Sequence, residues 1–316
     1  MEEYSVYNDI SKRTNGEFYL GVCGPVRTGK STFIKKFMEM FVLPGIEDEN
    51  DRKRAMDELP QSAEGKTIMT TEPKFIPKEA VRINLFDGNE IKVRMVDCVG
   101  YIVEDANGLM EGERERMVMT PWSEEPMPFA KAAEYGTKKV IHDHSTIGIV
   151  ITTDGSFGDI SRQSYKAAED KTISELKALG KPFIVIVNSA NPFGEKAKDV
   201  ITEIKERTDV TPVALNCMQL SSEDVKKIMK KILDSFPVSQ VSFYLPKWVE
   251  MLKTSHWLKQ ELIAKVREIL AKVSCIGDIN RENMLSDSDY IRQFDINNID
   301  MTNGNVSITV KFDEEK

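Results

Sequence analysis

The chain has 316 residues, of which 41% are apolar and 30% charged, and its formal net charge is −8. This composition is typical of a globular protein that is long enough for more than one domain. The acidic balance argues against a general nucleic-acid-binding or anionic-membrane surface, and no apolar run is long enough for a transmembrane helix.

The N-terminal segment and the cysteines indicate a reducing compartment. Residues 1–9 are acidic and polar and show no signal-peptide pattern. The four cysteines are widely spaced and form no C-x-x-C pair, so we expect reduced thiols rather than disulfides or a metal site. They are Cys23, Cys98, Cys217 and Cys275. We therefore expect a cytoplasmic protein.

The first predicted elements flank a phosphate-binding motif. Residues 18–23 predict a short buried strand and residues 31–41 a helix. Between them, residues 24–31 read Gly-Pro-Val-Arg-Thr-Gly-Lys-Ser, a complete G-x-x-x-x-G-K-[ST] sequence. The glycines let backbone N–H groups point at phosphate oxygens, Lys30 can reach the β- and γ-phosphates, and Ser31 can offer its hydroxyl to Mg²⁺. The residues expected to bind the nucleotide here are Gly24, Pro25, Val26, Arg27, Thr28, Gly29, Lys30, Ser31 and Thr32.

The next segments predict a magnesium site. Thr70 and Thr71 precede a predicted hairpin with strands at 80–85 and 90–96, and that hairpin ends in Asp97-Cys98-Val99-Gly100. An Asp-x-x-Gly sequence in this place is typical of switch-type nucleotide hydrolases, where Asp97 would hold Mg²⁺ and the Gly100 N–H would bond the γ-phosphate. Catalysis is expected to depend on Lys30, Thr70, Thr71 and Asp97. The expected metal ligands are Ser31, Thr71 and Asp97, although the pattern alone does not separate the two threonines.

The rest of the chain alternates strands and helices after an irregular segment at 104–139. Strands are predicted at 146–152, 183–187 and 212–216, and helices at 161–179, 197–208 and 221–236. Continuous apolar strands that alternate with helices predict an α/β fold, a P-loop NTPase with a mostly parallel, switch-GTPase-like sheet and helices on both faces. A seam at 237–242 would separate a P-loop domain at 1–237 from a second, α+β domain at 238–316, of which this chain would hold a part. That part carries a predicted helix at 247–273 and a strand at 306–312.

Residues 188–191 bear on the choice of base. GTPases carry Asn-Lys-x-Asp after this strand, and the aspartate accepts two hydrogen bonds from guanine. Here Asn188-Ser189-Ala190-Asn191 places an amide where the carboxylate would be, and an amide cannot serve as a charged double acceptor. We therefore predict ATP as the nucleotide, with Asn188 among its contacts. Tyr101 occupies the position of the glutamine that orients water in small switch proteins, so the water-activating residue is not identified.

Three further polar groups have competing interpretations. A local structural role is favoured over metal binding for the His142-Asp143-His144 run. Asp154, at the end of a predicted strand, could mark a structural turn or contact the nucleotide. Arg162 is a weaker candidate for stabilising charge on the phosphates.

The motifs at 24–31, Thr70-Thr71, 97–101 and 144–155 together resemble the stage IV sporulation protein A family. The resemblance implies a switch-GTPase-like fold that uses ATP and Mg²⁺, with Lys30 as the loop lysine, Thr70 and Thr71 as sensor threonines and Asp97 as the second magnesium-site aspartate. It also implies ATP hydrolysis coupled to self-assembly of the spore coat basement layer, in the mother-cell cytoplasm at the outer surface of the forespore.

The same resemblance implies the partners. They are further copies of the protein, a small amphipathic membrane-anchoring peptide and other spore coat proteins, with no nucleic acid and only indirect membrane contact. Family members are longer, and their C-terminal domain carries localisation and polymer contacts. The resemblance implies that this chain lacks that domain and part of the middle domain but keeps the nucleotide chemistry. Two alternatives stay open: a GTPase-type molecular switch, and a nucleotide-stabilised scaffold without significant turnover.

Overall fold

A computed structural model describes residues 17–60, 73–86, 89–104, 106, 108–111, 114–280, 288–300 and 303–313. Internal contacts divide the chain into two compact units, Met1–Met229 and Lys230–Lys316. The division falls within helix α7 (Ser222–Asp234), a few residues before the predicted seam at 237–242. Each unit is described by itself.

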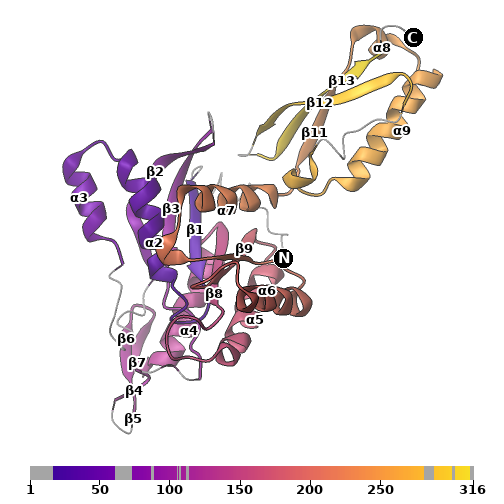
Figure 1. Ribbon diagram of the computed structural model, residues 1–316. Helices are drawn as coiled ribbons and strands as arrows, with labels where there is room; N and C mark the ends of the chain where they lie inside the picture. Colours follow the sequence, from indigo (N-terminus) through magenta and orange to yellow (C-terminus); the bar gives the residue numbers. More distant parts are fainter. Residues whose placement is uncertain are drawn as a thin grey trace. The chain divides into compact units, whose positions relative to one another are not determined.

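Unit 1 is built on a six-stranded sheet with the strand order β10-β9-β8-β1-β3-β2 (Figure 1). Its strands are β1 (Glu17–Cys23), β2 (Lys74–Phe86), β3 (Asn89–Asp97), β8 (Ile147–Thr153), β9 (Phe183–Asn188) and β10 (Val213–Leu215). Neighbouring strands are parallel except β2, which pairs antiparallel with β3. The prediction of a mostly parallel sheet is confirmed. The strand β8 lies near its centre and is buried along its whole length, which explains its continuous apolar sequence.

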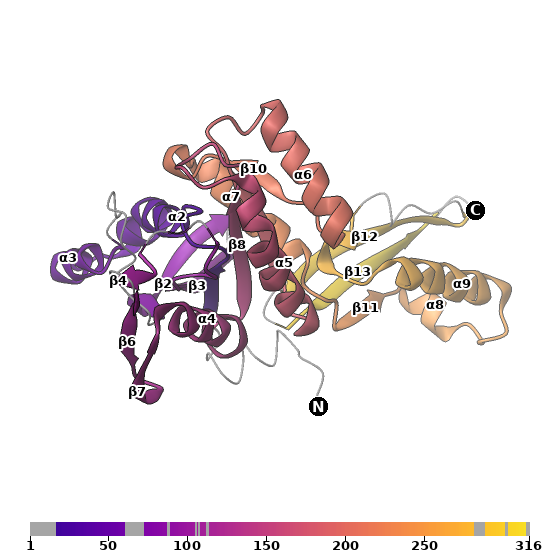
Figure 2. The ribbon, with the colours of Figure 1, turned by 90° about the horizontal axis from the view of Figure 1, so that it is seen from below.

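Helices cover both sides of this sheet, and Figure 2 shows α2 and α4 on opposite sides of the strands. They are α2 (Lys30–Phe37), α3 (Glu49–Asp57), α4 (Phe129–Lys139), α5 (Arg162–Ala178), α6 (Glu195–Thr208) and α7, with short turns η2 (Met38–Val42), η3 (Leu43–Gly45), η4 (Val140–His144) and η5 (Cys217–Gln219). Close helix packing needs a glycine in β8, because a Cβ at Gly148 would lie 2.9 Å from the Leu176 side chain of α5.

The segment expected to be irregular contains more structure than its sequence indicated. Two small hairpins precede α4: β4 (Met110–Glu111) with β5 (Arg114–Glu115), and β6 (Met117–Thr120) with β7 (Ser123–Pro128). Most of their residues are half-buried or exposed. Such strands bury too little apolar surface to show the alternation that identifies a strand from sequence.

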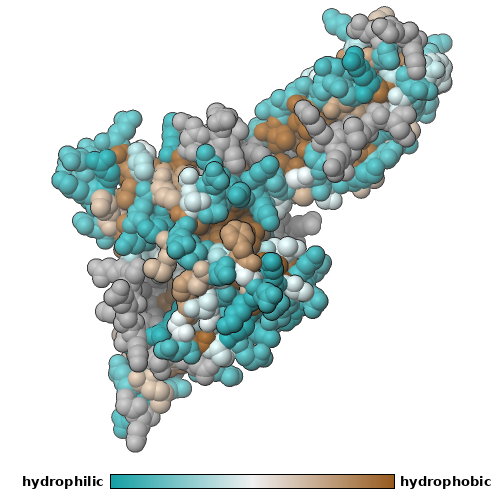
Figure 3. Space-filling view, in the orientation of Figure 1, coloured by the Kyte–Doolittle hydropathy of each residue, from teal (hydrophilic) through white to brown (hydrophobic). Residues whose placement is uncertain are grey.

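Unit 2 contains a three-stranded sheet with the order β11-β13-β12. Its elements are β11 (Gln240–Tyr244), α8 (Lys247–Met251), α9 (Trp257–Lys272), η6 (Ile276–Asp278), β12 (Ile291–Asp300) and β13 (Asn305–Phe312). The single helix predicted at 247–273 is wrong: Leu252 is extended, and His256 caps a new helix by accepting a hydrogen bond from the Leu258 N–H at 3.3 Å. Figure 3 shows apolar side chains among hydrophilic ones at the surface of this unit. Its exposed apolar residues include Trp248 and Met251.

Candidate active site

The loop between β1 and α2 has a backbone conformation that depends on its two glycines. Gly24 and Gly29 have φ angles of +124° and +97°. A Cβ at Gly24 would lie 2.4 Å from the Ile151 carbonyl oxygen, and one at Gly29 would lie 2.4 Å from Nδ2 of Asn188. Both positions therefore require glycine for their backbone conformation and for close packing. Arg27 also has a positive φ, of 61°, and is exposed.

Residues of the loop are held by hydrogen bonds to the segment that follows β3. The Val26 N–H donates to the Tyr101 carbonyl at 2.9 Å, and the Tyr101 N–H donates to the Gly24 carbonyl at 3.1 Å. Within the loop, the Thr28 hydroxyl donates to the Pro25 carbonyl at 3.0 Å. The two sequence motifs predicted to act together are thus joined through their backbones.

Lys30, the first residue of α2, points back into the loop. Its side chain is buried and its ammonium donates to the Pro25 carbonyl at 2.5 Å. Burial lowers the pKa of the Lys30 ammonium, while Cys98 and Asp97 act in the opposite direction. An ammonium carries three protons, so this group can donate to additional acceptors such as phosphate oxygens.

Asp97, at the end of β3, lies beside α2 and has an unused acceptor. The Ser31 hydroxyl donates to Oδ2 of Asp97 at 3.5 Å, whereas Oδ1 is buried and has no hydrogen-bond partner among the described residues. Burial raises the pKa of Asp97 to about 6, and the Lys30 charge partly offsets this rise. A carboxylate with a buried, unsatisfied oxygen next to a hydroxyl fits a hard cation such as Mg²⁺.

That cation would depend on few protein ligands. Within the described ranges, no group of three or more His, Cys, Asp or Glu side chains is placed to hold a metal. Mg²⁺ commonly binds through one or two protein groups together with substrate phosphates and water. The pair Thr70 and Thr71, expected to complete the site, lies outside the described residues, so its role stays a prediction.

Gly100 and Tyr101 differ in how they relate to the loop. Gly100 has a φ of +97°, and a Cβ there would lie 2.5 Å from Nζ of Lys30. The Tyr101 side chain is instead buried; its hydroxyl donates to Glu175 of α5 at 2.5 Å, and Lys171 lies 4.6 Å from the ring centroid. These contacts make Tyr101 a core residue rather than a group that could orient water.

Asn188, predicted to contact the nucleotide, joins the loop to a neighbouring strand end. Its Nδ2 donates to the Thr28 carbonyl at 3.0 Å, and its Oδ1 accepts from the Cys217 N–H at 3.0 Å. Both ends of the amide are therefore used to hold the loop. Asn191, at the position of the guanine-binding aspartate, is exposed, and its N–H donates to the Ser189 hydroxyl at 3.1 Å.

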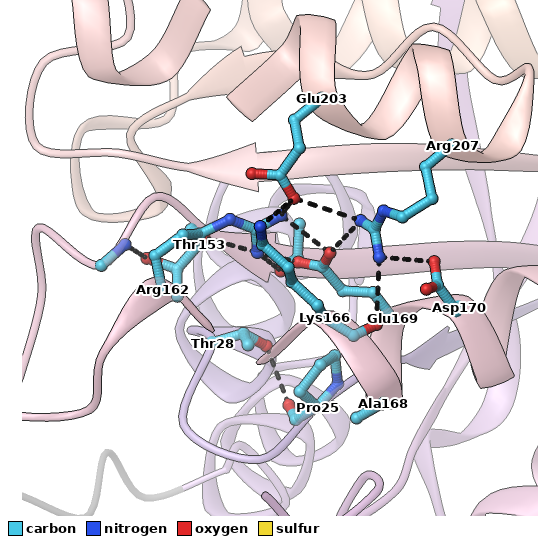
Figure 4. A network of polar contacts seen from close by, with 12 residues as sticks. Pro25, Thr28, Thr153, Arg162, Lys166, Ala168, Glu169, Asp170, Glu203 and Arg207 are labelled. Carbon is cyan, nitrogen blue, oxygen red and sulfur yellow. Dashed lines mark hydrogen bonds and ion pairs between the residues drawn. The ribbon is translucent and has the colours of Figure 1, made fainter. Parts of the chain in front are cut away.

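Asp154 and Arg162 form contacts that are typical of structural residues. Asp154 is buried and accepts from the Ser189 hydroxyl at 2.6 Å and the Ser156 N–H at 2.9 Å, which favours the structural turn. Figure 4 shows the guanidinium groups of Arg162 and Arg207 around Glu169, to which Arg162 donates at 2.8 Å and Arg207 at 2.9 Å. The Glu169 carboxylate is fully buried, so these arginines neutralise a charge inside the protein.

The run of two histidines also has structural contacts. The His144 ring packs edge-on against Phe75, with centroids 5.4 Å apart. The His142 carbonyl accepts from the Lys181 ammonium at 2.8 Å. These contacts agree with the structural role that the sequence favoured.

Sequence reasoning missed Thr137 of α4. Its hydroxyl accepts a hydrogen bond from the Gly100 N–H at 3.1 Å, the group predicted to read the γ-phosphate. Thr137 lies 37 residues along the chain from Gly100, inside a segment with no recognisable motif. No signal in the local sequence could have identified it.

The helices give no indication of a membrane span. In the part of the chain that the structure describes, each helix is too short or too polar to cross a bilayer.

Comparisons with known proteins match both units. Residues 1–237 match the model for the stage IV sporulation protein A ATPase domain, and residues 238–316 match the model for the middle domain of the same family. A solved structure of an SsGBP variant also resembles the chain, with 13% identity over 71% of this chain and 59% of that one and a TM-score of 0.37. That likeness is too distant to bear on function.

Three curated relatives are each named stage IV sporulation protein A. The protein from Bacillus subtilis is 47% identical over 96% of this chain and 62% of its own length. Those from Clostridioides difficile and Bacillus anthracis are each 46% identical, over 97% and 100% of this chain and 63% and 64% of their own lengths. The chain thus spans slightly less than two thirds of these relatives. By family model and by identity, the chain belongs to the stage IV sporulation protein A family.

Proposed function

We propose that this chain is a Mg²⁺-dependent ATPase of P-loop type, acting in sporulation. The observation that carries the proposal is the convergence of the loop at 24–31, Lys30 and the unsatisfied Asp97 carboxylate at one edge of the sheet. Gly100 reaches the same place, because a Cβ there would lie 2.5 Å from Nζ of Lys30. Ligands bind at the carboxyl ends of parallel strands, which is where these groups lie.

Each residue has a role that follows from its chemistry. The loop N–H groups and the N-terminus of α2 attract the triphosphate, and Lys30 donates to its β- and γ-oxygens. Ser31, Asp97 and either Thr70 or Thr71 would hold the metal. Bound Mg²⁺ supplies neutralisation of charge on the phosphates. Asn188 keeps the loop in shape by its hydrogen bonds to Thr28 and Cys217.

The strand order supports a switch-type P-loop fold. The loop follows β1 and the Asp97 motif follows β3, its direct neighbour in the sheet, while β2 forms an antiparallel hairpin with β3. Adjacent parallel strands bring their carboxyl ends side by side, so the two motifs meet without any other element between them.

ATP is proposed over GTP because of Asn191, an exposed amide without the negative charge that guanine binding uses. The rival is a GTPase-type switch, which this strand order would also suit. Competition of unlabelled ATP against GTP for the chain separates the two, since a clear GTP preference would contradict the ATP proposal.

Membership of the family supports a wider proposal for the whole protein. Hydrolysis would drive a conformational change that leads to self-assembly of the spore coat basement layer at the outer forespore surface, in the mother-cell cytoplasm. The proposed partners are further copies, a small amphipathic membrane-anchoring peptide and other coat proteins. Sedimentation of the full-length protein with and without ATP tests the assembly step.

The hydrolysis step is tested by Asp97→Asn, which keeps the side-chain shape and removes its charge. We expect ATP turnover to fall by about a hundredfold, because a preorganised charged group near transferring phosphate contributes about 2.7 kcal/mol or more. Affinity for a non-hydrolysable ATP analogue should fall much less. The matched control is Asp154→Asn, at the end of β8 on the same edge, where the carboxylate is already hydrogen-bonded.

Two results would contradict this assignment. Equal turnover in wild type and Asp97→Asn would remove Asp97 from the magnesium site. Thermal stabilisation by the analogue with no phosphate release from ATP would instead support the nucleotide-stabilised scaffold.

A further inference from the structure

We propose that Thr137 is a positioning residue that competes with the γ-phosphate for the Gly100 N–H and so couples helix α4 to the nucleotide. The proposal rests on the ATP-binding function above. It concerns a side chain that does not touch the phosphates and acts through the backbone of Gly100.

The hydrogen bonds of Thr137 have a defined direction. Its hydroxyl donates to the Ala133 carbonyl at 2.7 Å, one turn back in α4. A hydroxyl has one proton, so the contact of 3.1 Å with the Gly100 nitrogen must be one in which Thr137 accepts. Thr137 is fully buried, and an amide that lost this acceptor would keep only the sulfur of Cys98, a weak acceptor, beside it.

Gly100 lies where its N–H could donate a hydrogen bond to a γ-phosphate. A Cβ on Gly100 would lie 2.3 Å from the Gly24 carbonyl oxygen and 2.5 Å from Nζ of Lys30, so its backbone touches both the loop and the phosphate-binding ammonium. The next residue is fixed on the loop through the Tyr101 hydrogen bonds to Gly24 and Val26. The peptide of Gly100 is therefore a short link between the fixed loop and α4.

One N–H proton cannot fully serve two acceptors on different sides. A phosphate oxygen that accepts from the Gly100 N–H must weaken the hydrogen bond between that N–H and Thr137. Helix α4 then loses a contact with the segment that follows β3. The start of α4 is itself tied to the preceding hairpins, because the Phe129 N–H donates to the Arg116 carbonyl at 2.8 Å. A triphosphate would loosen this link and a diphosphate would not, which makes α4 responsive to the γ-phosphate.

The test compares affinities for a non-hydrolysable ATP analogue and for ADP in the 316-residue chain by calorimetry. Thr137→Val keeps the side-chain shape and removes the acceptor, so the Gly100 N–H is left for the phosphate. We expect affinity for the analogue to rise by about tenfold, the equivalent of one buried hydrogen bond, and affinity for ADP to stay unchanged. Thr137→Ser keeps the hydroxyl and should restore the wild-type ratio.

A closely matched control exists in α5. Thr172 is also fully buried, and its hydroxyl donates to the Ala168 carbonyl at 2.7 Å, one turn back, as Thr137 does to Ala133. Thr172→Val therefore reproduces the loss of a buried helical hydroxyl away from Gly100 and should leave the ratio of the two affinities unchanged. Thr137→Ala, which also lacks the acceptor, provides the same measurement if the valine variant is unfolded.

The outcomes separate this inference from the proposed function. A ratio that changes in Thr137→Val no more than in Thr172→Val would overturn the inference and leave the ATPase proposal standing. A wild-type chain that binds neither the analogue nor ADP would contradict the proposed function itself, and the inference with it.

Discussion

Two buried lysines lie at opposite ends of the strands of one sheet and differ in how many hydrogen bonds their ammonium groups donate. Lys30 follows the carboxyl end of β1, and Lys181 precedes the amino end of β9; each is 5% exposed. The Lys181 ammonium donates to three carbonyls, those of Ile141 at 2.6 Å, His142 at 2.8 Å and Ser145 at 2.7 Å. Lys30 donates to one carbonyl among the described residues, that of Pro25.

The difference separates a structural charge from one that can bind a ligand. The carbonyls around Lys181 lie in η4 and directly after it, at the C-terminal end of a helical segment, where carbonyls lack helical N–H partners and a cation is favourable. All three of its protons are used. Lys30 has donors left, stands at a helix N-terminus and faces Asp97, whose Oδ1 is also unsatisfied. Equal burial therefore does not mean equal function; the unused hydrogen-bonding capacity distinguishes them.

The largest effect is expected from Lys30→Met. Its loss should reduce affinity for an ATP analogue by at least about a hundredfold, since charge-assisted hydrogen bonds contribute about 1.5–3 kcal/mol each and two phosphates are contacted. The free energy of unfolding should change little, because the native charge is poorly solvated. Calorimetry and urea unfolding measure the two quantities. An affinity close to that of the wild type would show that Lys30 does not bind phosphate.

Lys181→Met should show the reverse pattern. Three carbonyls lose the Lys181 ammonium, in two buried contacts and one half-buried contact, so we expect the free energy of unfolding to fall by about 3 kcal/mol while affinity for the ATP analogue is retained by the folded protein. Urea unfolding gives the first quantity, and calorimetry below the transition gives the second. If the variant folded normally but lost nucleotide affinity, the structural role assigned to Lys181 would be incorrect.

A smaller effect is expected from Tyr101→Phe. The change removes the hydroxyl that donates to Glu175, and we expect about 1 kcal/mol less stability because one partly buried hydrogen bond is lost. The rate of ATP hydrolysis should stay the same, since the side chain lies in the core. A clear fall in turnover with unchanged stability would show that the Tyr101 hydroxyl takes part in hydrolysis.

The positions of the main parallel strands along the chain and the phosphate-binding loop could be predicted from the sequence because their signals are local. Continuous apolar runs identify buried parallel strands, and the glycines at 24 and 29 indicate a backbone with positive φ angles, which other residues rarely adopt. The hairpin at β2 and β3 was predicted in the same way. The small strands before α4 and the strand β12, with many exposed residues, carry no such pattern and were missed.

The sequence by itself predicted the class of ligand, since the loop, Lys30, Ser31 and Asp97 are defined by residue type and spacing. Only the tertiary structure decided which polar groups have capacity left for that ligand. Tyr101 meets Glu175 across 74 residues, Asn188 meets the loop across 160, and Thr137 meets Gly100 across 37. A side chain's partners depend on which distant segments pack beside it, and packing is a property of the whole fold rather than of any local run of residues.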